Sequence, residues 1–181
     1  MKDRPASTIF ARGVRLVGAG HLVASSPRAR VVVPFDEASG LHAATWSPAL
    51  FSADEPVTVT GAGSADVPPF VVSASAPSPV SLDGPRDGTV VDREGGLVLT
   101  WPPGGDGYVD VLVKTGGHSW PCVFLRARGT ATIAARLFDD EPAGELTLAV
   151  AGLRTAAAER AGWHVSLTTA SARTEARLFL R

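Results

Sequence analysis

The chain has 181 residues, of which 45% are hydrophobic and 19% charged, so it can bury a substantial core as one large domain or two small ones. Its net charge is -1 and its arginines are scattered, which argues against nucleic-acid binding. The longest apolar runs, such as Val31 to Val33, fall far short of the roughly 20 residues that a membrane-spanning helix needs, so we expect no membrane span.

The first eighty residues predict short strands. Residues 9–24 favour two strands and a turn, because their apolar positions are interrupted by glycines. Gly18 and Gly20 do not complete a dinucleotide-binding loop, since Val23 stands at the third glycine position and Pro27 falls where the phosphate-binding helix should begin. Alternation of apolar and polar residues then predicts strands at Arg30 to Phe35, Val57 to Thr60 and Phe70 to Ser75.

The sequence between residues 96 and 138 has the clearest strand pattern of the chain. Its apolar residues recur at every second position, as in strands with one buried face, at Leu97, Leu99 and Trp101 and again at Val109, Val111 and Val113. The Pro- and Gly-rich segment 102–107 between these two sets predicts a turn, and hence a hairpin. Another strand is expected over Pro121 to Leu125, with Cys122 and Phe124 on one face.

Towards the end of the chain, one helical turn and three further strands are expected. Residues 133–138 have apolar pairs four positions apart, which predicts a single helical turn. The alanine-rich segment 153–162 could form a short helix, but it is too short and ends in Gly162, so a strand and hairpin are preferred. The three strands are centred on Leu148, Val165 and Leu178.

Together these patterns predict an all-β protein, an antiparallel β-sandwich of immunoglobulin-like type with two sandwich-like units and one short helical turn. The Pro- and Gly-rich segment 76–88 suggests a boundary between an N-terminal unit, 1–80, and a C-terminal unit, 81–181. The side chains expected to form one core are Leu97, Leu99, Trp101, Val109, Val111, Val113, Trp163, Val165 and Leu167.

Two resemblances accompany these patterns. The order of FSADEPVTVTGAG, LVLTWPPG, PCVF, TIAARLF and GWHVSLTTA resembles a group of uncharacterised secreted or lipoprotein-like proteins from high-GC soil bacteria such as myxobacteria, over roughly residues 46–170. That resemblance implies an extracellular or cell-envelope location, with a leader removed ahead of the sequence. The run LVLTWPPG followed by YVDVLV is similar to the early strands of fibronectin type III and other immunoglobulin-like domains, where a tryptophan packs between the sheets.

The residues that could carry chemistry are dispersed. The four histidines lie in separate elements, and His164 is expected to face solvent. Cys122 has no second cysteine for a disulfide or a redox pair, and it is expected to be a buried, inert thiol. The acidic segment Phe138 to Glu145 is the best candidate for a calcium loop, but it matches no calcium-loop pattern. We therefore expect neither a catalytic site, nor a metal, nor a cofactor.

Aromatic side chains are the remaining candidates for binding. Trp46 and Trp120, each next to serine and proline, are expected to be exposed and to anchor a ligand, whereas Trp101 and Trp163 should be core. With Tyr108 they could form a platform for a sugar ring. The function expected is a non-enzymatic, structural or binding role in the cell envelope or outside the cell, with another envelope protein or a surface glycan as partner. The alternative is a hydrolase whose site is assembled from distant loops.

Overall fold

The computed structural model describes residues 18–44 and 51–181, and this part of the chain is all-β, as predicted. The strands are β1 (Leu22–Ser25), β2 (Arg30–Val33), β3 (Phe35–Asp36), β4 (Leu41–His42), β5 (Pro56–Gly61), β6 (Phe70–Ser75), β7 (Val90–Val91), β8 (Leu97–Thr100), β9 (Tyr108–Lys114), β10 (Ser119–Leu125), β11 (Thr130–Ile133), β12 (Gly144–Arg160), β13 (Trp163–Ala170) and β14 (Thr174–Leu180). The described helical segments are two 3₁₀ turns, η1 (Arg126–Arg128) and η2 (Ala135–Leu137). Neither turn could span a membrane, being too short and insufficiently apolar.

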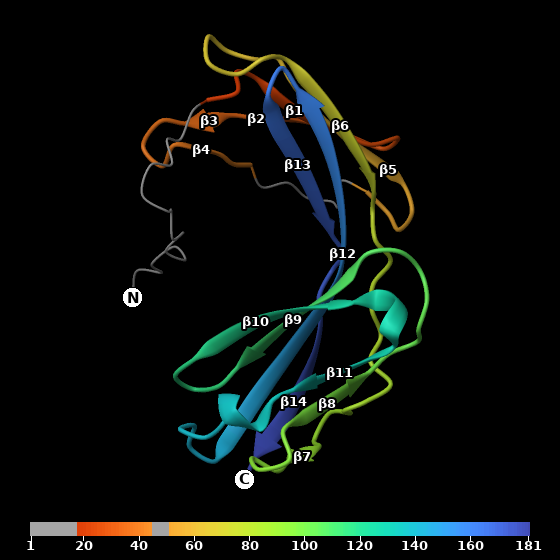
Figure 1. The fold of residues 1–181 in the computed structure, drawn as a ribbon, viewed down its shortest axis with the longest axis vertical. Coiled ribbons are helices and arrows are strands. Elements are labelled where there is room, and N and C mark those ends of the chain that lie inside the picture. Colours follow the sequence, from red (N-terminus) through yellow and green to blue (C-terminus); the bar gives the residue numbers. More distant parts are fainter. Residues whose placement is uncertain (1–17, 45–50) are drawn as a thin grey trace.

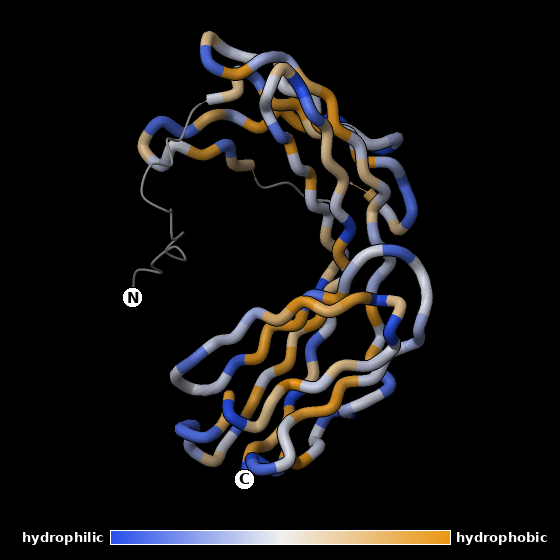
Figure 2. Tube along the Cα trace, in the orientation of Figure 1, coloured by the Kyte–Doolittle hydropathy of each residue, from blue (hydrophilic) through white to orange (hydrophobic). Residues whose placement is uncertain are grey.

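Strands β7 to β11 and β14, with the first part of β12, form the C-terminal sandwich (Figure 1). One sheet has the order β10-β9-β12-β14-β7, and the second consists of β8 paired with β11. The neighbouring strands β9, β12 and β14 follow the C-F-G order of an immunoglobulin-like sandwich. Apolar residues concentrate in the strands of this sandwich, while its turns are largely polar (Figure 2).

The core of the C-terminal sandwich lies between these two sheets. Six of the nine predicted core residues are buried in it, namely Leu97, Leu99, Trp101, Val109, Val111 and Val113. Phe138, placed by the turn η2, closes the same core and is fully buried. The predicted helical turn is therefore confirmed as a 3₁₀ turn over Ala135–Leu137, although Ile133 of the predicted segment belongs to β11.

The N-terminal sheet has the order β2-β1-β5-β6, and all its pairs are antiparallel. The hydrophobic residues buried in and around it are small, and they are Ala24, Val57, Val67, Val72, Ala74 and Ala76. The short hairpin of β3 and β4 lies beside this sheet. A sheet with such small buried side chains needs a second layer to exclude water from its inner face.

Strand β12 supplies that layer because it is 17 residues long. At about 3.4 Å per residue it extends about 55 Å, well beyond the sandwich. Its first part pairs with β9 and β14, and its last part, from Leu153 onward, pairs with β13. The expected strand and hairpin at 153–162 are thus confirmed, and the hairpin of β12 and β13 packs beside β6 (Figure 1).

The remaining three predicted core residues, Trp163, Val165 and Leu167, do not join the core of the C-terminal sandwich. Trp163 is 39% exposed at the tip of the hairpin, and the other two are only half-buried. Alternation placed the three on one face, but that face belongs to the part of β13 that extends past the sandwich. The prediction that they complete one core with Trp101 is wrong.

Two polar contacts attach the hairpin to the N-terminal half of the chain. The Thr169 hydroxyl donates to the carbonyl oxygen of Ser75 at 3.1 Å, and Arg154 pairs with Asp54 at 3.1 Å. Residues from the second half of the sequence therefore pack against the N-terminal sheet. The division into 1–80 and 81–181 stays a prediction, but the layers do not follow it.

Candidate binding groove

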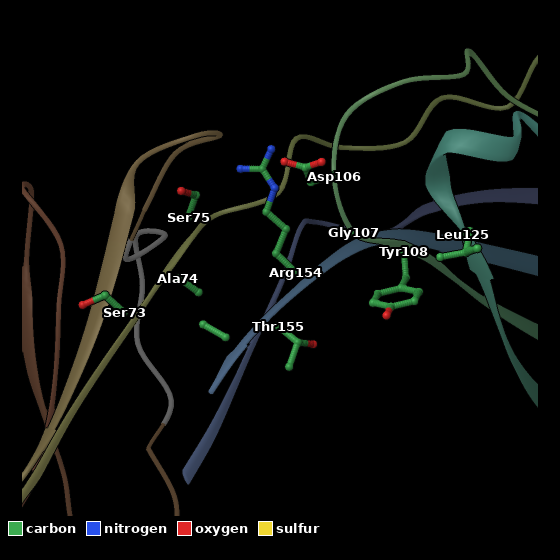
Figure 3. Close-up of a pocket in the computed structure, with 10 residues that line it drawn as sticks. Ser73, Ala74, Ser75, Asp106, Gly107, Tyr108, Leu125, Arg154 and Thr155 are labelled. Carbon is green, nitrogen blue, oxygen red and sulfur yellow. The ribbon is translucent and has the colours of Figure 1, made fainter. Parts of the chain in front are cut away.

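A groove of about 530 Å³ lies where the N-terminal sheet, the hairpin and the C-terminal sandwich meet, and we call it the junction groove. Its lining residues come from β6, β12, the start of β9 and the end of β10, and they are Ser73, Ala74, Ser75, Asp106, Gly107, Tyr108, Leu125, Arg154, Thr155 and Ala156 (Figure 3). These segments are far apart in the sequence. The groove therefore exists only because β12 carries the hairpin over to β6.

The floor of the junction groove is an open edge of β12. The ladder between β9 and β12 ends at the pair Tyr108 and Leu153, because β9 begins at Tyr108. On the side of β12 that faces away from β9, the Gly152 N–H donates to the Ser171 hydroxyl and the Gly152 carbonyl oxygen accepts from the Ser171 N–H. The N–H and C=O of a strand residue point to the same side of the strand, and that side alternates from one residue to the next. Those of Gly152 point towards Ser171, so those of Thr155, three residues further on, point to the other side, towards the groove. No described strand pairs with β12 on that side beyond Leu153.

Gly107 allows β9 and β12 to approach each other at this point. Its φ is 101°, in the region that favours glycine, and a Cβ there would clash with the carbonyl oxygen of Leu153. The next residue, Tyr108, is 40% exposed and forms a cross-strand pair with Leu125, which is 49% exposed. The Tyr108 ring is therefore partly exposed to solvent at the start of β9.

Polar side chains of the groove lie on both sides of the β12 edge. Tyr108 and Thr155 extend to one side, whereas Arg154 and Asp106 lie on the other (Figure 3). Arg154 is paired with Asp54. Within residues 18–44 and 51–181, the Asp106 carboxylate, the Tyr108 hydroxyl and the Ser75 hydroxyl have no hydrogen-bond partner. They remain available for a ligand.

The two tryptophans expected to anchor a ligand do not line the groove. Trp46 lies outside the described residues. Trp120 is half-buried and packs edge-on against Phe138, with ring centroids 6.3 Å apart. The expectation that Trp120 is exposed is wrong, because it shares the inward face of β10 with Cys122 and Phe124.

A second group of polar side chains forms around Glu141. This carboxylate is almost fully buried and accepts hydrogen bonds from the Thr115 hydroxyl and from His118 Nδ1, both at 2.5 Å. The Thr115 hydrogen bond, followed by that of His118, holds the pKa of Glu141 below its ordinary value. A histidine oriented by a carboxylate can act as a base, but no serine or cysteine nucleophile is hydrogen-bonded to His118 in the described structure. The arrangement fixes the β9–β10 turn against the 138–141 segment.

The other candidate sites are isolated. Cys122 is half-buried, and burial, followed by the charge of Asp110, raises the pKa of its thiol. His164 faces solvent as expected and pairs with Glu159 at 2.6 Å. Among the residues that the structure describes, no three His, Cys, Asp or Glu side chains are grouped to hold a metal ion, including those of the segment 138–145.

Comparison with known proteins adds no further assignment, since no protein-family model matches the chain and no curated protein matches it. A second hollow, of about 580 Å³, lies beside Phe35 and Val32 in the N-terminal half. Because it extends to Gly18, the first described residue, the junction groove is the better defined of the two.

Proposed function

We propose that the protein is a non-enzymatic binding module of the cell envelope or the extracellular space, and that it engages another envelope protein or a surface glycan through the junction groove. The observation that supports this most is the groove itself, which has an exposed aromatic ring on β9 and unpartnered polar side chains. The extracellular location is favoured by the Gly-, Pro-, Ser- and Thr-rich composition.

The distribution of titratable groups supports binding over catalysis. A catalytic site normally gathers several titratable side chains with perturbed pKa values in one pocket. Here the titratable side chains that line the junction groove are Asp106, Tyr108 and Arg154, and the perturbed carboxyl of Glu141 lies elsewhere, beside His118. Among the described residues, the His118–Glu141 pair is the arrangement that the alternative function, a hydrolase, would use.

Saturable binding is the experiment that separates these functions. The purified protein is titrated against the envelope fraction of its source and applied to a glycan array, and the same sample is assayed with chromogenic ester and glycoside substrates. We expect saturable binding that weakens in Tyr108→Ala, without turnover. Turnover that is lost in His118→Ala, with no saturable binding, would contradict the proposal and favour the hydrolase.

A further inference from the structure

The junction groove carries almost no net charge. Its charged lining residues are one acid, Asp106, and one base, Arg154, and the base is already paired with Asp54. A site for a polyanion would instead need several unpaired basic groups. The groove therefore offers no unpaired basic side chain to hold an anionic ligand.

The hydrogen-bonding groups of the groove suit a ligand with many hydroxyls. The Asp106 carboxylate accepts, the Tyr108 and Ser75 hydroxyls both donate and accept, and the backbone of Thr155 presents an N–H and a C=O at the open edge of β12. These groups lie on both sides of that edge (Figure 3). A ligand lying across the edge would reach all of them.

The exposed ring of Tyr108 supplies the apolar contact. A flat aromatic face covers the apolar side of a pyranose ring, and the side chain of Leu125 widens this surface. An extended peptide could also pair with the edge of β12, but its side chains would meet mostly hydroxyl and charged groups, where apolar pockets are needed to anchor it.

We infer that the junction groove binds a neutral saccharide chain that lies across the β12 edge, with one sugar ring stacked on Tyr108 and the hydroxyls of the chain bonded to Asp106, Ser75 and the β12 edge. This inference rests on the proposed binding function and names the ligand class at the same site. The groove volume of about 530 Å³ is in the range of small-ligand sites and holds a few sugar rings.

The test uses the full chain on an array of neutral, acidic and amino-sugar oligosaccharides, with isothermal titration of the strongest neutral ligand. Tyr108→Ala should weaken binding about ten-fold or more, because it removes the central aromatic contact. Tyr108→Phe, which keeps the ring, should bind more tightly than Tyr108→Ala. Asp106→Asn should weaken binding while leaving the circular dichroism spectrum unchanged.

Phe179→Ala is the matched control, since Phe179 is an aromatic residue, 47% exposed on β14 and outside the groove. It should bind like the unmodified protein. Affinity for a neutral sugar should also change little between low and high salt. Preference for acidic or amino-sugar chains, or equal loss of affinity in Phe179→Ala and Tyr108→Ala, would overturn the inference.

The two proposals fail differently in this test. A silent array together with saturable, Tyr108-dependent binding to an envelope protein would overturn the saccharide inference and leave the binding function standing. If the protein bound neither the array nor an envelope protein, both the saccharide inference and the proposed binding function would be wrong.

Discussion

Replacing Trp101 with alanine should be among the most destabilising single changes in the C-terminal sandwich. Only 1% of Trp101 is exposed, and it lies in the core with its ring 6.4 Å from that of Phe124. Its indole Nε1–H donates to the carbonyl oxygen of Arg126 at 2.8 Å. The substitution therefore creates a large cavity and also removes one of the two hydrogen bonds to this carbonyl, which then keeps only the Gly129 N–H.

The expected cost is about 3 to 5 kcal/mol, the range observed when buried large aromatic residues are replaced by alanine. With a urea slope of about 2 kcal/mol/M, that loss lowers the unfolding midpoint by about 2 M. Trp101→Phe keeps most of the volume and removes only the indole hydrogen bond, while the Gly129 N–H still donates to the Arg126 carbonyl, so it should cost about 0.5 to 1.5 kcal/mol.

Urea unfolding followed by far-UV circular dichroism measures these losses without depending on the fluorescence of the deleted tryptophan. Arg177→Ala is the control, since Arg177 is exposed on β14, and it should cost under about 0.5 kcal/mol. If Trp101→Ala and Arg177→Ala shifted the midpoint equally, the assignment of the inward and outward faces would be wrong.

Three further predictions concern other parts of the chain. The turn between β12 and β13 has Ala161 at φ 47° before Gly162, so Ala161→Asn should raise the free energy of unfolding by about 1 kcal/mol, and an unchanged melting temperature would argue against this turn. The lowered pKa of Glu141 implies a contribution to stability that is present above the ordinary pKa of 4.5 and lost as the pH falls through the folded-state pKa. Below pH 4.5 the melting temperature of Glu141→Gln should therefore fall less than that of the unmodified protein. Melting temperatures that fall in parallel for the two proteins would refute this. Because burial raises the pKa of the Cys122 thiol, a thiol-reactive dye at neutral pH should label it much more slowly in the folded protein than in urea, and equal rates would contradict its half-buried position.

The fold was largely predictable because strand alternation is a local property. Leu97 to Trp101 and Val109 to Val113 have the faces that their alternation predicted. Trp120 was misjudged because its Ser and Pro neighbours were given more weight than its shared face with Cys122 and Phe124. For this strand, parity was the better signal.

Alternation cannot indicate which layer a face packs against. That limit explains the error at Trp163, whose face meets the N-terminal half because β12 is longer than the sandwich. The junction groove was beyond prediction for the same reason, since it joins Ser75, Tyr108 and Thr155 from three separate strands. The only local sign was Tyr108 itself, an aromatic residue directly after a turn glycine at the start of a strand.

Mapping the bound ligand on the protein tests the proposed role of the junction groove most directly. Backbone amide shifts are recorded by NMR while the neutral oligosaccharide with the strongest array signal is added. The account predicts that the largest changes fall on Gly107, Tyr108 and Thr155, with none at Phe179. Saturable changes confined to residues outside the groove, with Tyr108 and Thr155 unmoved, would contradict it.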